Sequence, residues 1–257
     1  MTEQKIYDRA INILDNFLDE SLKVIETIPP NNLWKEQLIY KLYKQSSHIA
    51  FALLSHTDKS KYQSEKYVSD IILIGALGRI IRDIYVNIIY LKTDKFSEKD
   101  MKTVWDFQVL YQKINLTHFE GIKDYTETLK QLEAERDSLK QQIDGITFST
   151  KGQVLMGKDE KLLSLQDLAD IKQFHKGKFH TEFAFFSQFS HSTAFANHFI
   201  KSNGIPLTII AATYDRIVAY FVGIVAESIE LLLPDHKDLE YLQKQYKDII
   251  ANRWNVK

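Results

Sequence analysis

Apolar residues recur at three- and four-residue steps along most of this chain, which is the spacing of one face of an α-helix. In residues 3–28 the stripe runs from Ile6 to Ile25 and ends before Pro29, a residue that rarely continues a helix. The same spacing predicts further helices over 33–57, 68–91, 98–118, 164–174, 181–201, from Pro206 to Pro234 and over 235–254.

Few residues along the chain break helices. Only 4 prolines and 9 glycines occur in 257 residues, and the alternation of apolar and polar residues that is typical of strands is scarce. Residues 145–161 lose helical spacing and carry three glycines, so a short β-hairpin or an ordered loop fits them. The sequence therefore predicts an all-α fold, a multi-helix bundle with at most one short β-hairpin.

Residues 120–144 have a narrower apolar stripe than the other predicted helices. A seam at alternating three- and four-residue steps lasts about three heptads, with charged residues nearly everywhere else, as in a coiled coil. Its members are Ile122, Tyr125, Leu129, Leu132, Arg136, Leu139 and Ile143. We expect a single helical domain over 1–257, with 120–160 as a protruding arm of one heptad-patterned helix plus a hairpin or loop. The seam would pair within the chain, across a homo-oligomer or with another protein.

The helix predicted over 68–91 is apolar around most of its circumference, yet it carries Arg79, Arg82 and Asp83. At about 100° per residue these three side chains share one face, and Gly78 and Asn87 lie on the same face. The opposite face, which includes Leu73 and Ile80, is purely aliphatic.

Two interpretations of this charged face stay open. It can meet solvent, with Arg79 and Asp83 as an ion pair one turn apart, or it can line a polar pocket inside the bundle. The second interpretation requires partners for the charges, because an unpaired buried ion costs several kcal/mol or more.

Composition narrows the classes of function. The formal charge of −1 gives no overall field that attracts nucleic acid or an anionic membrane. No cysteine is present, so disulfides and thiolate chemistry are excluded. The acidic start lacks the pattern of a signal peptide, and the longest charge-free apolar stretches are too short to span a membrane. We expect a soluble cytoplasmic protein without membrane contact.

The helix predicted over 181–201 holds a second polar group of residues. Ser187, His191 and His198 lie four and seven residues apart and share one face. A serine hydrolase is disfavoured, because no nucleophile elbow or glycine-rich oxyanion loop accompanies Ser187. The histidines also lack the glutamate spacing of di-iron or zinc helices, so we expect no metal and no cofactor.

Residues 82–87 (RDIYVN) are similar to the motif of HEPN ribonucleases, a superfamily of helical nucleotide-binding proteins. That motif is an arginine, usually a polar residue, three further residues and a histidine. Here Arg82, Asp83 and the spacing match, but Asn87 replaces the histidine and cannot transfer protons. His191 can substitute for it only if the fold brings the two helices together.

A wider resemblance covers about 65–200. GALGRIIRDIYVNIIYL, followed about 100 residues later by FFSQFSHSTA, resembles an uncharacterised family of bacterial all-helical proteins that is HEPN-related or abortive-infection-like. Its members tend to carry an Arg-x-x-x-Glu helix and a Ser-x-x-x-His helix. Arg79 and Asp83 match the first pair, with Asp in place of Glu, and Ser187 and His191 match the second. The resemblance implies a fold and a site more than an activity.

Two functional hypotheses result. The first is a HEPN-like protein of antiviral defence or stress response that binds, and in its catalytic form cleaves, RNA or a nucleotide between helices 68–91 and 181–201. Arg82 and His191 would be catalytic, and the ligand would contact Arg79, Asp83, Asn87 and Ser187. The second is a non-catalytic interaction module that assembles through 120–144.

Overall fold

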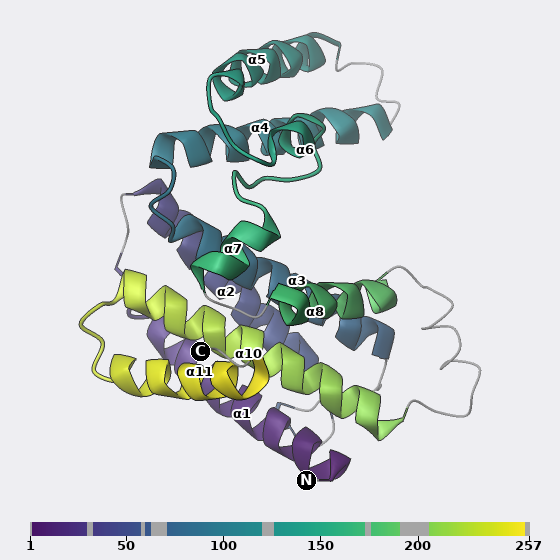
Figure 1. Ribbon diagram of the computed structural model, residues 1–257, viewed down its shortest axis with the longest axis vertical. Coiled ribbons are helices and arrows are strands. Elements are labelled where there is room, and N and C mark those ends of the chain that lie inside the picture. The colour runs from purple at the N-terminus through teal and green to yellow at the C-terminus, as the bar shows by residue number, and fades with distance from the viewer. Residues whose placement is uncertain are drawn as a thin grey trace. The chain divides into compact units, whose positions relative to one another are not determined.

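A computed structural model of the chain shows an all-α architecture (Figure 1). It describes residues 2–29, 33–57, 60–62, 71–119, 126–172, 176–190 and 206–254. These residues form ten helices and no strand, so the predicted fold class is confirmed. They divide into two compact units, Met1–Ile89 with Ala169–Lys257, and Tyr90–Leu168. The single domain over 1–257 stays a prediction, and the second unit begins at Tyr90 rather than at residue 120.

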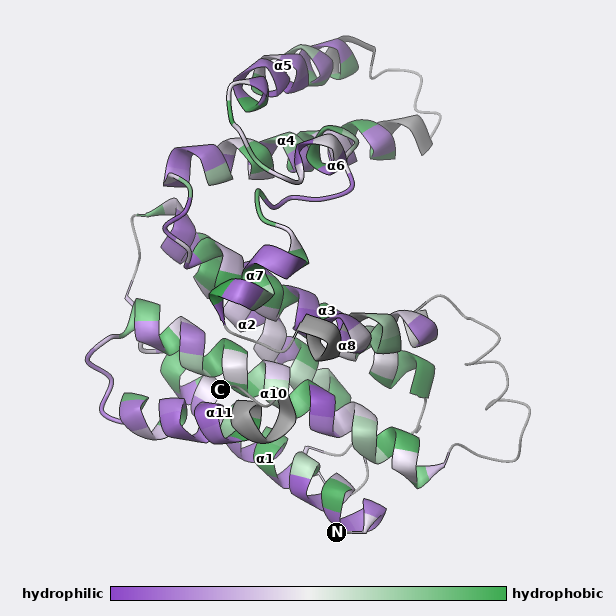
Figure 2. Ribbon diagram, viewed as in Figure 1, coloured by the Kyte–Doolittle hydropathy of each residue, from purple (hydrophilic) through white to green (hydrophobic). Residues whose placement is uncertain are grey.

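The first unit is built around a long apolar helix. Its helices are α1 (Glu3–Ile25), α2 (Trp34–Ser55), α3 (Ile71–Leu91, whose end crosses the unit boundary), α8 (Lys176–Ser190), α10 (Leu207–Leu232) and α11 (Leu239–Trp254). Helix α10 packs against α1, α2 and α11, and every residue from Ile217 to Ile229 is buried. A helix that is buried on most sides is mostly apolar, and Figure 2 shows more hydrophobic residues on α10 than on the hydrophilic α11.

By length and composition α10 could also span a membrane. However, 72% of its most apolar window is buried inside the protein, which is usual for the core helix of a soluble protein. The burial of α10 is therefore compatible with the predicted solubility.

The second unit contains α4 (Glu98–Phe119), α5 (Thr126–Asp144), α6 (Lys151–Leu155) and the first residues of α7 (Leu165–Ile171). Helix α4 begins as predicted, because the Asp100 amide donates to the Ser97 hydroxyl at 3.1 Å, an N-cap bond. Helices α4 and α5 pack against each other. Along the predicted seam Ile143 is buried and Leu129, Leu132 and Leu139 are half-buried, whereas Ile122 and Tyr125 lie outside the described residues.

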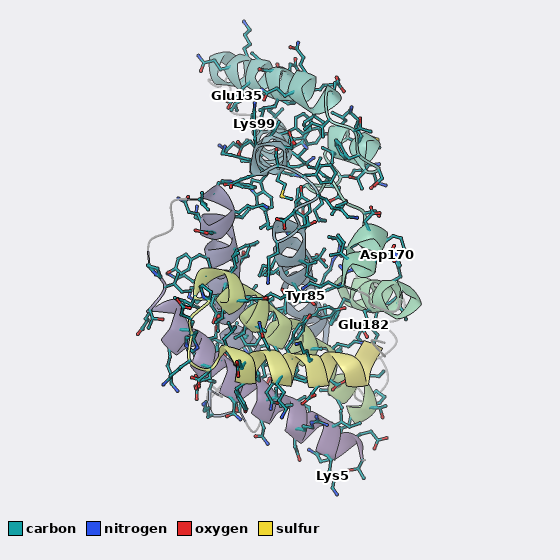
Figure 3. All side chains as sticks on the ribbon, turned by 60° about the vertical axis from the view of Figure 1, so that its left-hand side comes forward. Lys5, Tyr85, Lys99, Glu135, Asp170 and Glu182 are labelled. Atoms are coloured by element: carbon teal, nitrogen blue, oxygen red, sulfur yellow. The ribbon has the colours of Figure 1, made fainter. Side chains whose placement is uncertain are left out.

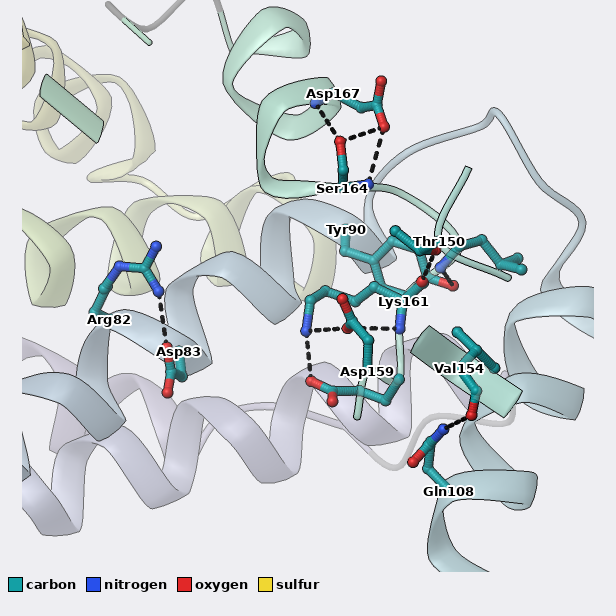
Figure 4. Close-up of polar contacts among 12 residues, drawn as sticks. Arg82, Asp83, Tyr90, Gln108, Thr150, Val154, Asp159, Lys161, Ser164 and Asp167 are labelled. Atoms are coloured by element: carbon teal, nitrogen blue, oxygen red, sulfur yellow. Dashed lines mark hydrogen bonds and ion pairs between the residues drawn. The ribbon is translucent and has the colours of Figure 1, made fainter. Parts of the chain in front are cut away.

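The segment from residue 145 to α8 differs in part from the predicted elements. Residues 145–161 form no hairpin; turns enclose the five-residue α6, and Gly157 takes a φ of +70°. Helix α7 begins with a capping box: the Ser164 amide donates to Asp167 Oδ2 at 2.9 Å, and the Asp167 amide donates to the Ser164 hydroxyl at 3.2 Å (Figure 4). Helix α8 starts at Lys176, five residues before the start of the helix predicted over 181–201.

Candidate functional site

The charged residues of α3 form one small network. Arg82 is 1% exposed, and its Nη1 donates to Asp83 Oδ1 at 2.9 Å (Figure 4). Arg79 Nε lies 3.7 Å from Asp83 Oδ2. The Asp83 side chain is 46% exposed and that of Arg79 28%. One carboxylate at the surface therefore holds both a surface arginine and a buried one.

The residues that were predicted to share one face of α3 differ in burial. Gly78 and Arg82 are buried, Arg79, Asp83 and Asn87 lie at its rim, and Ile80 is 40% exposed. The solvent interpretation is therefore wrong for Arg82, and the aliphatic face is partly open. On a helix that is apolar nearly all round, the apolar spacing does not fix which side is buried.

The two helices predicted to lie together do so, through apolar atoms. A Cβ placed on Gly78 of α3 would lie 2.6 Å from Phe186 Cε1 of α8 and 2.9 Å from Ile217 Cγ1 of α10. Only a glycine permits this approach. Ser187, next to Phe186 on α8, is half-buried. His191 and His198 lie outside the described residues, so their predicted positions near Arg82 stay predictions.

Helix α8 contributes a buried carboxylate instead. Glu182 is buried, and its Oε1 lies 3.3 Å from Arg216 Nε of α10. The Arg216 guanidinium lies over the Phe185 ring, 4.1 Å from its centroid, and its Nη1 donates to the Ala212 carbonyl oxygen at 2.8 Å. The ion pair and the cation–π contact together fix α8 to α10.

A second buried group of residues was not predicted from the sequence. Glu227 of α10 is 3% exposed and pairs with Lys172. Near it the Tyr85 and Tyr246 hydroxyls share a hydrogen bond. Burial, with contributions from Tyr246 and Glu227, raises the pKa of Tyr85 well above its usual range, so this phenol stays protonated.

The tyrosines connect four helices of the first unit. Tyr85 of α3 lies 5.5 Å, centroid to centroid, from Tyr220 of α10 and 6.4 Å from Tyr246 of α11. Tyr220 in turn lies 6.2 Å from Phe186 of α8. Figure 3 shows Tyr85 among these helices, with Glu182 on the neighbouring α8. Tyr85 and Tyr220 lie on helices that are otherwise mostly apolar, and this was the sequence signal for the group, since a buried phenol usually finds a polar partner.

The candidate site therefore contains both buried charged side chains and partly exposed polar side chains. Arg82, Glu182 and Glu227 are all buried, and each pairs with a charged residue, namely Asp83, Arg216 and Lys172. Among the predicted site residues that the structure describes, Arg79, Asp83, Asn87 and Ser187 are partly exposed, and Arg82 is buried. The Asn87 Oδ1 is buried and has no hydrogen-bond partner among the described residues. In the part of the chain that the structure describes, no group of histidine and acidic residues can hold a metal ion.

No protein-family model, curated protein or solved structure matches this chain. The site must therefore be interpreted from its own chemistry.

Proposed function

We propose that this chain is a HEPN-like cytoplasmic protein that binds RNA or a nucleotide through the charged network of α3. The observation that supports the proposal is the burial of Arg82 on a helix that is otherwise apolar on its buried side. A buried ion is costly to stability, so its presence is better explained by binding than by packing. The planar guanidinium suits phosphate because it donates two parallel hydrogen bonds.

The proposed order of contacts follows from exposure. Arg79 meets a phosphate first, since its side chain reaches solvent. Asp83 then releases one arginine as the phosphate oxygens replace its carboxylate. Asn87 and Ser187 donate to the sugar or base. In the catalytic form of the proposal, His191 takes the proton of a ribose 2′-hydroxyl, because an imidazole titrates near neutral pH. The 2′-oxygen then bonds to phosphorus, the bond from phosphorus to the 5′-oxygen breaks, and that oxygen receives the proton from His191. Arg82 stabilises the charge that develops on phosphorus-bound oxygen.

The experiment measures binding and cleavage of a labelled single-stranded RNA and of a labelled ATP by the full chain. We expect Arg79→Gln to weaken binding about tenfold or more, and His191→Gln to abolish cleavage while binding persists. Arg82→Lys keeps the positive charge but cannot donate two parallel hydrogen bonds to a phosphate, so it should weaken binding while the protein remains folded. Arg136→Gln is the matched control, since Arg136 pairs with Asp137 on α5.

Two results would overturn the proposal: no binding of either probe at low salt, or equal binding by Arg79→Gln and Arg136→Gln. The proposed role in antiviral defence is tested separately, by counting phage plaques. Bacteria that express the chain should give fewer phage plaques than bacteria that express His191→Gln, and equal plaque counts would contradict it.

The α5 seam supports a second proposal, a helical assembly module that acts through 120–144 as a protruding arm. Leu129, Leu132 and Leu139 are half-buried although α4 packs against α5, so apolar surface remains for another helix. Leu129→Ser with Leu132→Ser should lower the mass measured by light scattering, or increase protease cleavage of the arm, with the rest of the chain folded. An unchanged mass and unchanged protease resistance would contradict this proposal.

A further inference from the structure

An apolar groove lies on the second unit, between α4 and the loop that follows α6. Its volume is about 470 Å³. The α4 wall carries Trp105, Gln108, Val109, Gln112, Lys113 and Leu116, and the loop wall carries Gly157, Lys158 and Glu160. Val109 is 39% exposed and Leu116 65%, and Met156 beside the loop wall is also exposed. The groove therefore exposes several large apolar side chains to solvent.

The groove exists because α4 has two apolar faces. Its core face, which includes Met101, Val104, Phe107 and Ile114, is buried. At about 100° per residue, Trp105, Val109 and Leu116 point in the opposite direction. With Gln112 they form a 4-3-4 spacing, which is the spacing of a helix that packs against another helix. A solvent-facing helix surface is normally polar, so this stripe indicates a partner.

The walls of the groove are held in place. Gln108 Nε2 donates to the Val154 carbonyl oxygen at 2.7 Å (Figure 4), which ties α6 to α4. Gly157, at a φ of +70°, approaches Tyr111 so closely that a Cβ would lie 2.2 Å from Tyr111 Cε1. The groove is therefore formed before any partner binds, which lowers the cost of ordering on binding.

The charge at the rim of the groove is positive. Lys113 and Lys158 line it, and neither makes an ion pair among the residues that the structure describes. The carboxylates of Glu160 and Asp159 both lie against Lys161, at 2.7 and 3.0 Å, so their salt bridges are made within the loop and not with the two lysines of the groove. A partner with acidic side chains at its edges would complement these two lysines.

We propose that this groove binds one amphipathic helix of a partner protein, with apolar residues at three- and four-residue steps and acidic residues beside them. From Trp105 to Leu116 the stripe is about 18 Å long at 1.5 Å per residue, which matches roughly three turns of a bound helix. Such helix-in-groove recognition uses apolar anchors at i, i+3, i+4 and i+7. A small ligand fits less well, because a small-molecule site buries about 70–90% of its ligand, whereas this groove has exposed walls.

The test uses two labelled 16-residue helical peptides and the full chain. Both peptides carry four leucines in 4-3-4 spacing; one has glutamates at the flanking positions and the other lysines. Fluorescence anisotropy should show that the acidic peptide binds at least about tenfold more tightly than the basic one. Leu116→Ser and Val109→Ser should each weaken binding of the acidic peptide about tenfold, a hot-spot effect, without a change in melting temperature.

Reversing the charge of the two groove lysines tests whether they select an acidic partner. The double variant Lys113→Glu with Lys158→Glu should prefer the basic peptide. Lys140→Glu, a charge reversal on α5 outside the groove, should bind both peptides as the unaltered chain does. The proposal is overturned if neither peptide binds, if charge reversal leaves the preference unchanged, or if Leu116→Ser has no effect. It is also overturned if sodium dodecanoate occupies the groove more tightly than the acidic peptide. The proposal is likewise overturned if sedimentation shows a dimer of the chain and Leu116→Ser dissociates it. The groove would then bind a second copy of the chain and not an acidic partner helix.

Discussion

Adding one methyl group at Gly78 tests the packing that brings α3, α8 and α10 together. Gly78→Ala should lower the free energy of unfolding even though alanine favours helices over glycine by about 1 kcal/mol. The new Cβ would lie 2.6 Å from Phe186 Cε1 and 2.9 Å from Ile217 Cγ1. Overpacking of this kind costs about 1–3 kcal/mol, so the expected net loss is about 0–2 kcal/mol.

Gly152 provides the matched control, because a Cβ there has no atom within 4 Å. Gly152→Ala should leave stability unchanged or raise it by up to about 1 kcal/mol. Gly223→Ala is a second test within the same unit as Gly78, since its Cβ would lie 2.6 Å from Tyr85 Cε2. Urea unfolding followed by circular dichroism at 222 nm should separate Gly78→Ala from Gly152→Ala by about 1–3 kcal/mol. If Gly78→Ala is as stable as Gly152→Ala, α8 does not pack on α3 at this point.

Further predictions concern Arg82 and the start of α7. Arg82→Ala should cost about 2–5 kcal/mol in urea unfolding because it leaves a cavity at a fully buried position, whereas Arg79→Ala should change stability by at most about 0.5 kcal/mol; equal losses would contradict the burial of Arg82. Ser164→Ala should destabilise by about 0.5–2 kcal/mol at pH 7. Hydrogen bonds from the Ser164 hydroxyl and, to a smaller extent, from the Ser164 amide hold the pKa of Asp167 below its usual range. A group whose pKa is depressed in the folded state stabilises the fold at pH values above its unfolded pKa, here near 3.8, and this contribution is lost as the pH falls further. The cost of Ser164→Ala should therefore be largest near pH 7 and shrink below pH 4 in acid-unfolding curves, and a cost that rises with acidity would refute the assignment.

The spacing of apolar residues located the long helices well. The predicted 98–118 became Glu98–Phe119, and the stretch between Pro206 and Pro234 became Leu207–Leu232. Both have local end signals, a capping serine in the first and prolines in the second, and such signals act within a few residues. The five residues of α6 are too few to show a period, so a loop or hairpin was the nearest inference.

The packing of the site was less predictable. Helix α3 is apolar nearly all round, so its sequence did not show that Arg82 points inward while Ile80 is exposed. The contact at Gly78 depends on Phe186 and Ile217, which are more than 100 residues away in the sequence. Tertiary partners at such distances leave no trace in local spacing, which is why the tyrosine group was missed as well.

The geometry of α3 limits how many phosphates the proposed site can hold. Arg79 and Arg82 share the single carboxylate of Asp83, so at most two cations become available to a ligand. For a single-stranded nucleic acid, the logarithm of the affinity falls with the logarithm of salt concentration with a slope of about −0.7 per phosphate contacted. Binding at this site should therefore show a slope between about −0.7 and −1.4 from 50 to 200 mM salt. Arg79→Gln should reduce the slope by about 0.7 if its guanidinium meets one phosphate. A much steeper slope, or one that Arg79→Gln leaves unchanged, would mean that RNA binds to another surface of the chain.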